Sequence, residues 1–340
     1  MRFLLAACGM LVALGACATQ IPAAPNLPDA IAISYHSIAL SPANLKEDRV
    51  GQLIWRGGIE ISSPDARFGG WSGLIVSADG THMLSQSDEA HWLKANLVYD
   101  ANGNLAGIDH AELADMLNMS GEPMIKKEGD AEGLAALSPK GPDGPVIVSF
   151  EGNDRVWRYD LSHNLHAKPR IVPMPAAIAH LLPNLGLEGL TMLHSSTILA
   201  VAEDTRDANN DMQAWLVHYP VGEESLQHGQ LGVKAHPPYE ISDAAMGPDG
   251  NLYLLERHYF GPLGGIVAAV RKIDRASIKP GARLEGDEIA QFTMRENIDN
   301  MEGLSLRRGA DGKTLVYMIS DDNYNHGIQR TVLLMFELAQ

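Results

Sequence analysis

Cysteine is nearly absent from this 340-residue chain, whose only two cysteines, Cys8 and Cys17, both lie near the N-terminus. The rest of the chain therefore has no disulfide and no thiol chemistry. Its fold must depend on a hydrophobic core, which a content of 45% hydrophobic residues is ample to build.

Basic and aromatic residues are also scarce. The sequence has 26 Lys and Arg against 42 Asp and Glu, a formal net charge of −16, and no basic run offsets it. Such a chain repels nucleic acid and anionic lipid surfaces. Aromatic residues make up only 6%, which does not suggest platforms for stacking bases. If the protein acts on an anionic substrate, cations must bind between the two.

Several catalytic motifs are missing. The segment Gly70-Trp71-Ser72-Gly73 has the wrong spacing for a Gly-x-Ser-x-Gly elbow. The sequence also lacks His-Glu-x-x-His, a phosphate-binding glycine loop followed by Lys, and a dinucleotide fingerprint. These absences argue against a serine hydrolase, a zinc protease and an ATPase.

The longest apolar run lies at the N-terminus. Arg2 precedes an almost entirely apolar stretch over residues 3–16, which is the length of a signal sequence but too short to span a membrane. Leu14-Gly15-Ala16-Cys17 resembles a bacterial lipobox, and predicts a lipidated Cys17. We therefore expect a lipoprotein signal peptide over 1–17, a Pro-containing tether over 18–30 and one domain over 31–340.

This interpretation predicts a location. The protein would be exported and anchored by lipid to the membrane facing the periplasm or the cell exterior. Ala18 is not the Asp that resembles an inner-membrane retention signal, so we expect the outer membrane. The lipid would be its only membrane contact. The alternative is a plain secretory peptide that happens to contain Cys17.

A motif repeats along the rest of the chain. The second residues of the five segments, at positions 72, 132, 188, 243 and 302, are 60, 56, 55 and 59 positions apart. The segments are Trp71-Ser72-Gly73-Leu74, Ala131-Glu132-Gly133-Leu134, Leu187-Glu188-Gly189-Leu190, Ser242-Asp243-Ala244-Ala245 and Met301-Glu302-Gly303-Leu304.

Each repeat has the pattern of a propeller blade. A short apolar strand is followed by a turn such as Pro248-Asp249-Gly250, by a second apolar strand that ends in an acid, and by a third strand. This predicts an all-β propeller of five blades, whose incomplete last blade is closed by a strand from residues 50–61. A sixth blade from residues 31–61 and an irregular β-sandwich are the alternatives. We expect short helices only near 110–117 and 176–182.

Acidic side chains mark the repeats. If the first strands line a central channel, Glu132, Glu188, Asp243 and Glu302 start equivalent strands and point to one place. The acids that end the second strands, Glu151, Glu203, Glu256 and Asp321, would gather near one rim. Carboxylates this close raise each other's pKa unless a cation neutralises them, and oxygen ligands suit Ca²⁺ or another divalent cation. No Lys or Arg occupies the start positions. The alternative is that these acids bind backbone amides between blades.

Other polar residues are candidates. Asp321-Asp322-Asn323-Tyr324-Asn325 is the densest oxygen cluster and predicts either metal ligands or an Asx turn. The predicted metal ligands are thus Glu132, Glu188, Glu302, Asp321 and Asp322. Arg67, Arg257 and Arg330 are predicted to bind substrate oxygens, unless they pair with neighbouring acids. His194, His258 and His326 are candidates for a general base.

These motifs resemble the phytase-like esterase family, a group of secreted β-propeller-type proteins. The resemblance rests on Arg67 to Leu74, Asp130 to Leu134, Asn184 to Leu190, Asp299 to Leu304 and Ser320 to Leu334, and extends over about residues 56–338. It implies hydrolysis of phosphate or carboxylic esters aided by divalent cations, but assigns no catalytic residue. The fourth repeat departs from the pattern, with Asp243-Ala244-Ala245 in place of Glu-Gly-Leu.

Two functions are consistent with these observations. One is a metal-assisted hydrolase of a small-molecule ester or phosphoester. The other is a non-catalytic propeller that binds an envelope partner or a small ligand.

Overall fold

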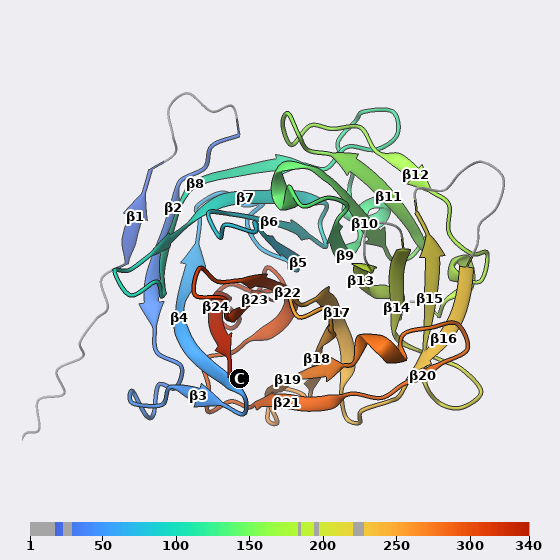
Figure 1. The fold of residues 1–340 in the computed structure, drawn as a ribbon. Coiled ribbons are helices and arrows are strands. Elements are labelled where there is room, and N and C mark those ends of the chain that lie inside the picture. The colour runs from blue at the N-terminus through green and yellow to red at the C-terminus, as the bar shows by residue number, and fades with distance from the viewer. Residues whose placement is uncertain (1–17, 23–28, 183–184, 194–196, 220–227, 340) are drawn as a thin grey trace, which may run out of the picture.

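A computed structural model describes residues 18–22, 29–182, 185–193, 197–219 and 228–339 (Figure 1). The predicted signal peptide, Cys17, residues 23–28 of the tether and His194 lie outside these residues. In the described part of the chain, no helix is long and apolar enough to cross a membrane.

The strands of the described residues pair into five sheets arranged as a ring (Figure 1). Four of the sheets are built mainly from consecutive strands. They are β5 (Trp71–Val76), β6 (His82–Ser87), β7 (His91–Tyr99) and β8 (Leu105–Asp115); β9 (Ala131–Ala136), β10 (Pro145–Phe150), β11 (Arg155–Asp160) and β12 (Arg170–Val172); β13 (Leu187–Leu193), β14 (Thr197–Arg206), β15 (Met212–His218), β16 (His228–Val233) and the short parallel β20 (Arg283–Leu284); and β17 (Glu240–Met246), β18 (Leu252–Tyr259), β19 (Ile266–Ile273) and β21 (Asp287–Phe292).

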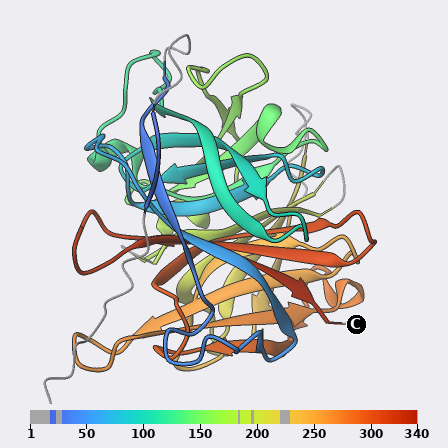
Figure 2. The ribbon, with the colours of Figure 1, turned by 90° about the vertical axis from the view of Figure 1, so that its left-hand side faces the viewer.

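The fifth sheet joins the two ends of the chain. It runs in the order β22 (Asn300–Arg308), β23 (Thr314–Asp321), β24 (Thr331–Leu338), β4 (Leu53–Ser62), β2 (Ile33–Ile38) and β1 (Thr19–Ile21), with β3 (Arg49–Val50) beside β4. Figure 2 shows these N-terminal strands, in blue, on the outside of the ring. The predicted β-propeller is confirmed, and so is its closure by an N-terminal strand. Residues 31–61 widen this sheet and form no separate blade.

Each pair of neighbouring sheets encloses part of the hydrophobic core. Within the described residues the core consists of five clusters, and each cluster draws on two adjacent sheets. Trp71 and Leu93, for example, pack with Ile319 and Leu333 across the junction between the first and the closing sheet. The ring is thus stabilised by face-to-face packing of twisted sheets, which is where strands with alternating apolar residues bury their side chains.

Helix is confined to short turns. The described residues contain α1 (Lys126–Gly129) and the 3-10 helices Gly141–Asp143, Ile178–His180 and Arg275–Ser277. The expected helix near 176–182 is thus a single 3-10 turn, but the one expected over 110–117 is wrong. Residues up to Asp115 belong to β8, where Ala111 and Leu113 are buried against β7. Strand pairing overrides the helical propensity of Ala, Glu, Leu and Met.

The five innermost strands share an irregularity at the repeated motif. In each sheet one extra residue of the inner strand bulges out of the pairing, at Ser72, within Glu132-Gly133, and at Glu188, Ser242 and Glu302. A bulge turns a side chain away from the regular alternation, and bulges are common next to functional sites. The register also corrects the sequence alignment of the fourth repeat: Ser242, and not Asp243, is equivalent to Glu302.

Candidate functional site

Two rings of side chains surround the axis at the end of the propeller where the inner strands begin. The first ring is the set of bulge residues Ser72, Glu132, Glu188, Ser242 and Glu302. The second ring lies on the second strands. In each sheet its member directly follows the residue that pairs with the one before the bulge. Its members are Asp88, Glu151, Glu203, Arg257 and Asp321, which lie opposite Gly70, Asp130, Gly186, Glu240 and Asn300. We call this end of the channel the acidic mouth.

The inner strands approach each other closely just behind the bulges. A Cβ atom on Gly133 would lie 2.5 Å from the carbonyl oxygen of Glu188 on the neighbouring strand, and one on Gly303 would lie 2.8 Å from the backbone of Gly73. Only glycine allows such contact. The glycines after Glu132 and Glu302 therefore let these strands approach their neighbours and hold the two carboxylates near the axis.

Burial changes the protonation of the acidic mouth. Burial, and then the nearby charges of Asp130 and Glu302, raises the pKa of Glu132 well above its ordinary value. Burial and the neighbouring Glu132 do the same to the pKa of Glu188. Burial raises the pKa of both Glu203 and Asp321 to about 8, although Arg257 opposes the shift at Glu203. These acids destabilise each other as anions, as the sequence predicted.

Arg257 supplies positive charge to this cluster. Its guanidinium forms ion pairs with Glu302 at 2.6 Å, Glu203 at 3.4 Å and Glu240 at 3.9 Å. Its side chain is only 19% exposed, and although burial lowers its pKa, the nearby charges of Glu302, Glu203 and Glu188 raise it overall. Sequence reasoning placed Glu256 in the second ring, but the register places Arg257 there. Glu256 is fully buried and pairs instead with Arg271 and His236.

A second cation lies across the mouth. Lys126, on α1, pairs with Asp88 and with Asp130 at 3.6 Å. Its ammonium group is half exposed, so it is available to solvent as well as to the acids. The acids of the first and second blades thus pair with the ammonium group of Lys126. Those on the other side of the mouth pair with the guanidinium of Arg257, from the fourth blade.

Three acids are close enough to share a cation. Oxygen atoms of Asp130, Glu132 and Glu151 all lie within 4.8 Å of one another, which is the one such group of three found among the described residues. Glu132 was predicted to be a metal ligand, whereas Asp130 and Glu151 were not. In addition, one carboxylate oxygen of Glu188 and one of Glu302 are buried without a hydrogen-bond partner among the described residues.

Asp321 and Asp322 hold a turn. Asp321 accepts a hydrogen bond from the backbone N–H of Asn323, and Asp322 accepts from the N–H groups of Tyr324 and Gly70 and from the Thr331 hydroxyl. This is the Asx turn that the sequence offered as an alternative. Asp321 lies in the second ring, while Asp322 ties the last blade to the first.

The tyrosine of this turn packs on two glycines of the first blade. Gly69 and Gly70 have φ values of +146° and +67°, and a Cβ on Gly70 would lie 2.6 Å from the Tyr324 ring. Asn323 and Tyr324 themselves have left-handed φ values of 48° and 49°. Such strained backbone is held in place by its surroundings and is frequent at binding sites. The Phe-Gly-Gly-Trp and Asp-Asp-Asn-Tyr motifs thus form one contact at the rim.

The remaining predicted arginines and histidines pair with neighbouring acids. Arg67 pairs with Asp65 and Asp115, and Arg330 pairs with Glu60 at 3.2 Å and Asp299 at 3.7 Å. His258 lies 3.5 Å from Glu240, and the exposed His326 lies 3.3 Å from Asp322.

Asp243 performs a structural role. It is 1% exposed, and its carboxylate accepts hydrogen bonds from the backbone N–H groups of Ala244 and Leu304, both at 2.7 Å. It therefore joins the fourth and fifth inner strands at the position that glycine occupies in the neighbouring repeats. The prediction that Asp243 points to the same place as Glu132, Glu188 and Glu302 is therefore wrong.

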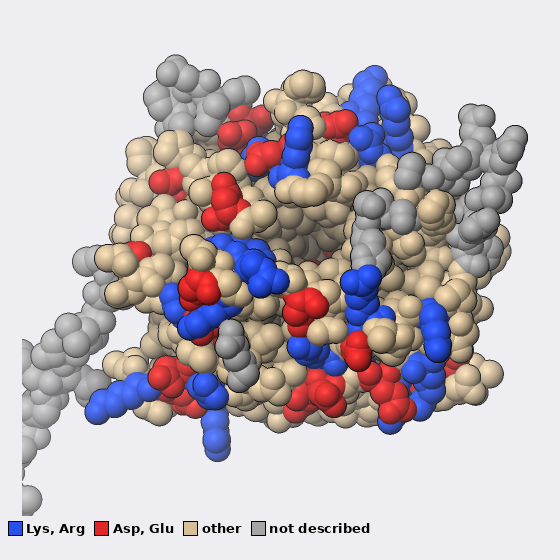
Figure 3. Space-filling model, viewed as in Figure 1, with Lys and Arg blue, Asp and Glu red and all other residues tan. Residues whose placement is uncertain are grey.

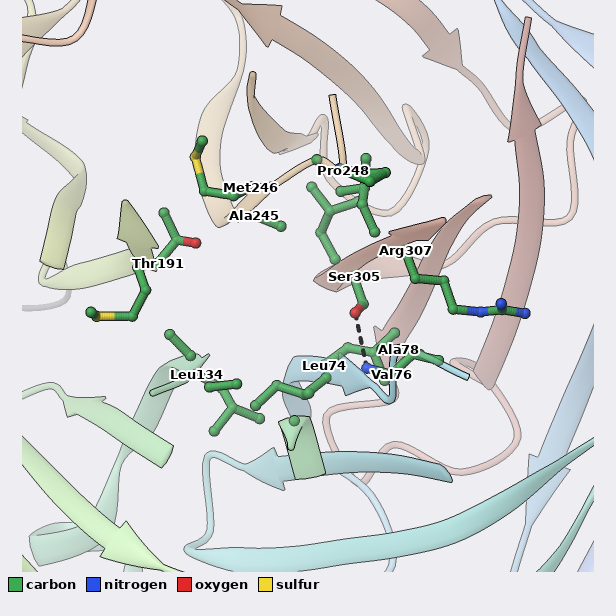
Figure 4. Close-up of a pocket in the computed structure, with 18 of the residues that line it drawn as sticks. Leu74, Val76, Ala78, Leu134, Thr191, Ala245, Met246, Pro248, Ser305 and Arg307 are labelled. Carbon is green, nitrogen blue, oxygen red and sulfur yellow. Dashed lines mark hydrogen bonds between the residues drawn. The ribbon is translucent and has the colours of Figure 1, made fainter. Parts of the chain in front are cut away.

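The opposite end of the axis is apolar. A hollow of about 650 Å³ is lined by residues such as Leu74, Leu134, Thr191 and Met246 from the far ends of the inner strands (Figure 4). Figure 3 shows it at the centre of the face, with uncharged atoms inside it. The Arg307 side chain points away from it, toward the rings of Tyr99 and Tyr317. The titratable groups of the axis are thus at the acidic mouth.

A closed ring of sheets around an acidic mouth defines the class of this protein as a β-propeller with a polar axial site. The sequence profile of the phytase-like family, described as having the esterase-like activity of phytase, matches residues 66–324. The chain belongs to this family. The match begins one residue before Arg67 and ends at Tyr324, so it spans both halves of the rim contact described above.

Comparison with solved structures gives distant similarities. The PQQ-bound aldose sugar dehydrogenase from Streptomyces coelicolor is 14% identical, with coverage of 79% of this chain and 95% of that chain and a TM-score of 0.41. AofleA from Arthrobotrys oligospora is 11% identical, with coverage of 84% and 82% and a TM-score of 0.40. No curated protein sequence matches the chain.

Proposed function

We propose that the acidic mouth hydrolyses an ester, phosphoric or carboxylic, with the help of a divalent cation such as Ca²⁺. The observation that carries this proposal is the group formed by Asp130, Glu132 and Glu151, whose oxygens lie within 4.8 Å of one another. Carboxylate oxygens without His or Cys are the ligands that Ca²⁺ and Mg²⁺ prefer. Membership of the phytase-like family supports the reaction class.

The residues present fit such an ion. Burial raises the pKa values of Asp130, Glu132 and Glu151, so the ionised forms of these groups lack sufficient stabilisation by neighbouring cations. Among the described residues Lys126 forms ion pairs with Asp88 and Asp130, and its charge also opposes the rise in the pKa of Glu151. The unpartnered oxygens of Glu188 and Glu302 show that acceptor capacity remains inside the mouth. Ca²⁺ takes 6–8 oxygens, which leaves positions for water and substrate beside three protein ligands.

Each group at the mouth has a distinct part in this proposal. A bound cation would polarise the ester and lower the pKa of an attacking water. Glu188, whose pKa burial and Glu132 raise, would carry the proton that this reaction exchanges. Arg257 offers the substrate oxygens a guanidinium that Glu203 and Glu302 already orient. The carboxylates exclude polyanions unless the cation is bound.

The test is calorimetric titration with Ca²⁺, together with hydrolysis of 4-nitrophenyl phosphate and 4-nitrophenyl butyrate. Glu132→Gln should weaken Ca²⁺ binding by about 10-fold or more and reduce hydrolysis in parallel, because it removes one of three charged ligands. Glu122→Gln, at an exposed turn, is the matched control and should change neither. If the wild-type protein binds no divalent cation at millimolar concentration, the metal proposal is wrong.

A non-catalytic role has its own support. Arg257 forms a close ion pair with Glu302 without any metal ion, and Ser242 donates its hydroxyl to the backbone oxygen of Met301 and so is not placed as a nucleophile. A propeller that only binds an envelope partner or a small ligand needs no more than this. Full Ca²⁺ binding with no turnover of either ester would favour that second function.

We also propose that the protein acts outside the cytoplasm as a lipoprotein. The lipobox-like sequence before Cys17 supports export and acylation at that residue, with the propeller held at the outer membrane by lipid alone. A net charge of −16 supports partners other than nucleic acid.

A further inference from the structure

A pocket of about 910 Å³ adjoins the acidic mouth between the fourth and fifth blades. Three connections form it: the one between β18 and β19, the one that leads into β22, and the long one between β23 and β24. Two of its lining residues also belong to the mouth. Arg257 and Asn300 both reach the same oxygen of Glu302, at 2.6 and 2.7 Å. The pocket and the mouth are therefore continuous.

One wall of this pocket is apolar and open to solvent. Tyr259, Met294 and Ile328 line it and are 55%, 61% and 79% exposed. Phe260 and Leu263, on the same hairpin as Tyr259, are 53% and 104% exposed. Half of the ten exposed large hydrophobic residues in the described chain thus lie on these three connections. Exposed apolar residues that gather at one place, rimmed by polar groups, mark a binding site.

The wall is held in position by local contacts. The Met294 sulfur accepts a hydrogen bond from the backbone N–H of Ile266, and a Cβ on Gly265 would lie 2.7 Å from the Met294 side chain. Gly265 has a φ of +71°, so the backbone there also requires glycine. Phe260 packs edge-on against His258, with ring centres 4.5 Å apart. The wall is thus held in place by contacts within the chain itself.

Another part of the lining is polar. It includes Asn300, Asn323, Asn325, Gln329, Arg330 and Asp299. Arg330 and Asp299 face each other at 3.7 Å, so this part of the lining offers amide groups and a balanced ion pair with little net charge. A pocket with one apolar wall and a few hydrogen-bonding groups is typical of a site for a small organic molecule. A polyanion would meet the acids of the mouth and no surplus of cations.

We infer that this pocket binds the alkyl or aryl group of an uncharged ligand, whose polar end extends toward Arg257 and Asn300 at the acidic mouth. Where the ligand is a substrate, it is a carboxylic ester with an apolar group. This part of the inference rests on the proposed hydrolase, whereas binding of the apolar group does not.

The decisive measurement is affinity as a function of chain length. Acetanilide, butyranilide and hexananilide are uncleaved by an ester hydrolase and differ only in methylene groups. We expect the Kd from calorimetry to fall about 3- to 4-fold per added methylene, which corresponds to about 0.8 kcal/mol per buried methylene. Equal affinity across the series, or no binding of any member, overturns the inference.

Two isoleucines provide matched variants. Ile328→Asp places a charge on the apolar wall and should weaken butyranilide binding about 10-fold or more. Ile171→Asp, on the edge strand β12 of the second blade, is the control, since Ile171 is 65% exposed and lies outside the pocket. Both side chains are exposed, so both variants should keep native circular dichroism. Equal affinity in the two variants contradicts the inference.

Turnover separates the two proposals. Chain-length-dependent binding with no hydrolysis of 4-nitrophenyl butyrate supports the pocket and refutes the hydrolase. Equal hydrolysis of 4-nitrophenyl acetate and hexanoate, unaffected by Ile328→Asp, supports the hydrolase and refutes the pocket.

Discussion

Glu203 should destabilise the folded protein at neutral pH. Its carboxyl is buried beside Glu302 and Glu240, and its pKa is raised from 4.5 to about 8. The folded protein therefore holds a proton at pH 7 that the unfolded chain has released. Since stability falls with pH wherever the folded state binds more protons, this contribution is lost as the pH rises from 4.5 toward 8.

The magnitude follows from that difference. In the unfolded chain Glu203 ionises above pH 4.5, whereas in the folded protein it stays protonated. Over the 2.5 pH units from 4.5 to 7, ionisation therefore stabilises the unfolded state relative to the folded state by about 3 kcal/mol. Glutamine has nearly the same shape and cannot ionise in either state. Glu203→Gln should therefore raise the free energy of unfolding by up to about 3 kcal/mol at pH 7 and leave it nearly unchanged at pH 4.5.

The assay is urea unfolding of both proteins between pH 4.5 and pH 7 in the presence of a chelator, so that no divalent cation neutralises the mouth. The exposed Glu122→Gln variant is the control, and its difference from wild type should not depend on pH. A Glu203→Gln variant that is less stable than wild type at pH 7, or equally shifted at both pH values, would show that folding does not raise the pKa of this carboxyl.

Three further outcomes test the architecture and the location. Deletion of residues 50–61 should abolish cooperative unfolding, because it removes β4 and opens the ring, whereas deletion of residues 18–22, which contain only the outermost strand β1, should preserve it; equal unfolding of the two deletion proteins would contradict closure by β4. Asp243→Ala should cost about 2–4 kcal/mol in urea unfolding, because it leaves two buried backbone N–H groups without an acceptor; a loss below 1 kcal/mol would exclude this role. Cys17→Ser should abolish acylation and release the protein from the membrane fraction or leave it unprocessed; unchanged mass and fractionation would show that Cys17 is not the anchor.

The architecture was accessible from sequence because the repeat is regular. The turns at Gly80, Gly250 and Gly312 adopt the positive φ values that an Asp-Gly hairpin requires, and strands follow them as predicted. The missing strand of the last repeat indicated closure from the N-terminal side, and β4 pairs with β24 there. A repeat of about 57 residues stays recognisable although single positions differ between blades, because each blade buries its own pattern of apolar residues.

The composition of the mouth was harder to predict, because it depends on one-residue shifts in register. An Asp in the fourth repeat looked like a shorter Glu, yet the bulge at Ser242 turns Asp243 toward the backbone of Leu304. The same shift brings Arg257 to the axis in place of Glu256. A slip of one residue exchanges the two faces of a strand, and apolar patterning does not locate a bulge.

Asp130 and Glu151 were missed as a pair for a related reason. Asp130 comes just before β9, while Glu151 follows β10, and they lie opposite each other only because the hairpin pairs in this register. Glu151 was noted as the acid at the end of a strand. A search for acids at both open ends of one hairpin would have found the two together.

The joint between β4 and β24 also constrains how the chain is made. Ile61 pairs with Thr331, so a strand near the start of the chain waits for a partner synthesised 270 residues later. At about 5–20 residues per second, the ribosome needs about 14–54 s to produce that partner. Throughout this interval the edge of β4 that will pair with β24 has no native neighbour, and the four intervening blades cannot close into a ring. An unpaired strand edge is open to pairing with another chain, so the ring is protected from such pairing only once its last strand is present.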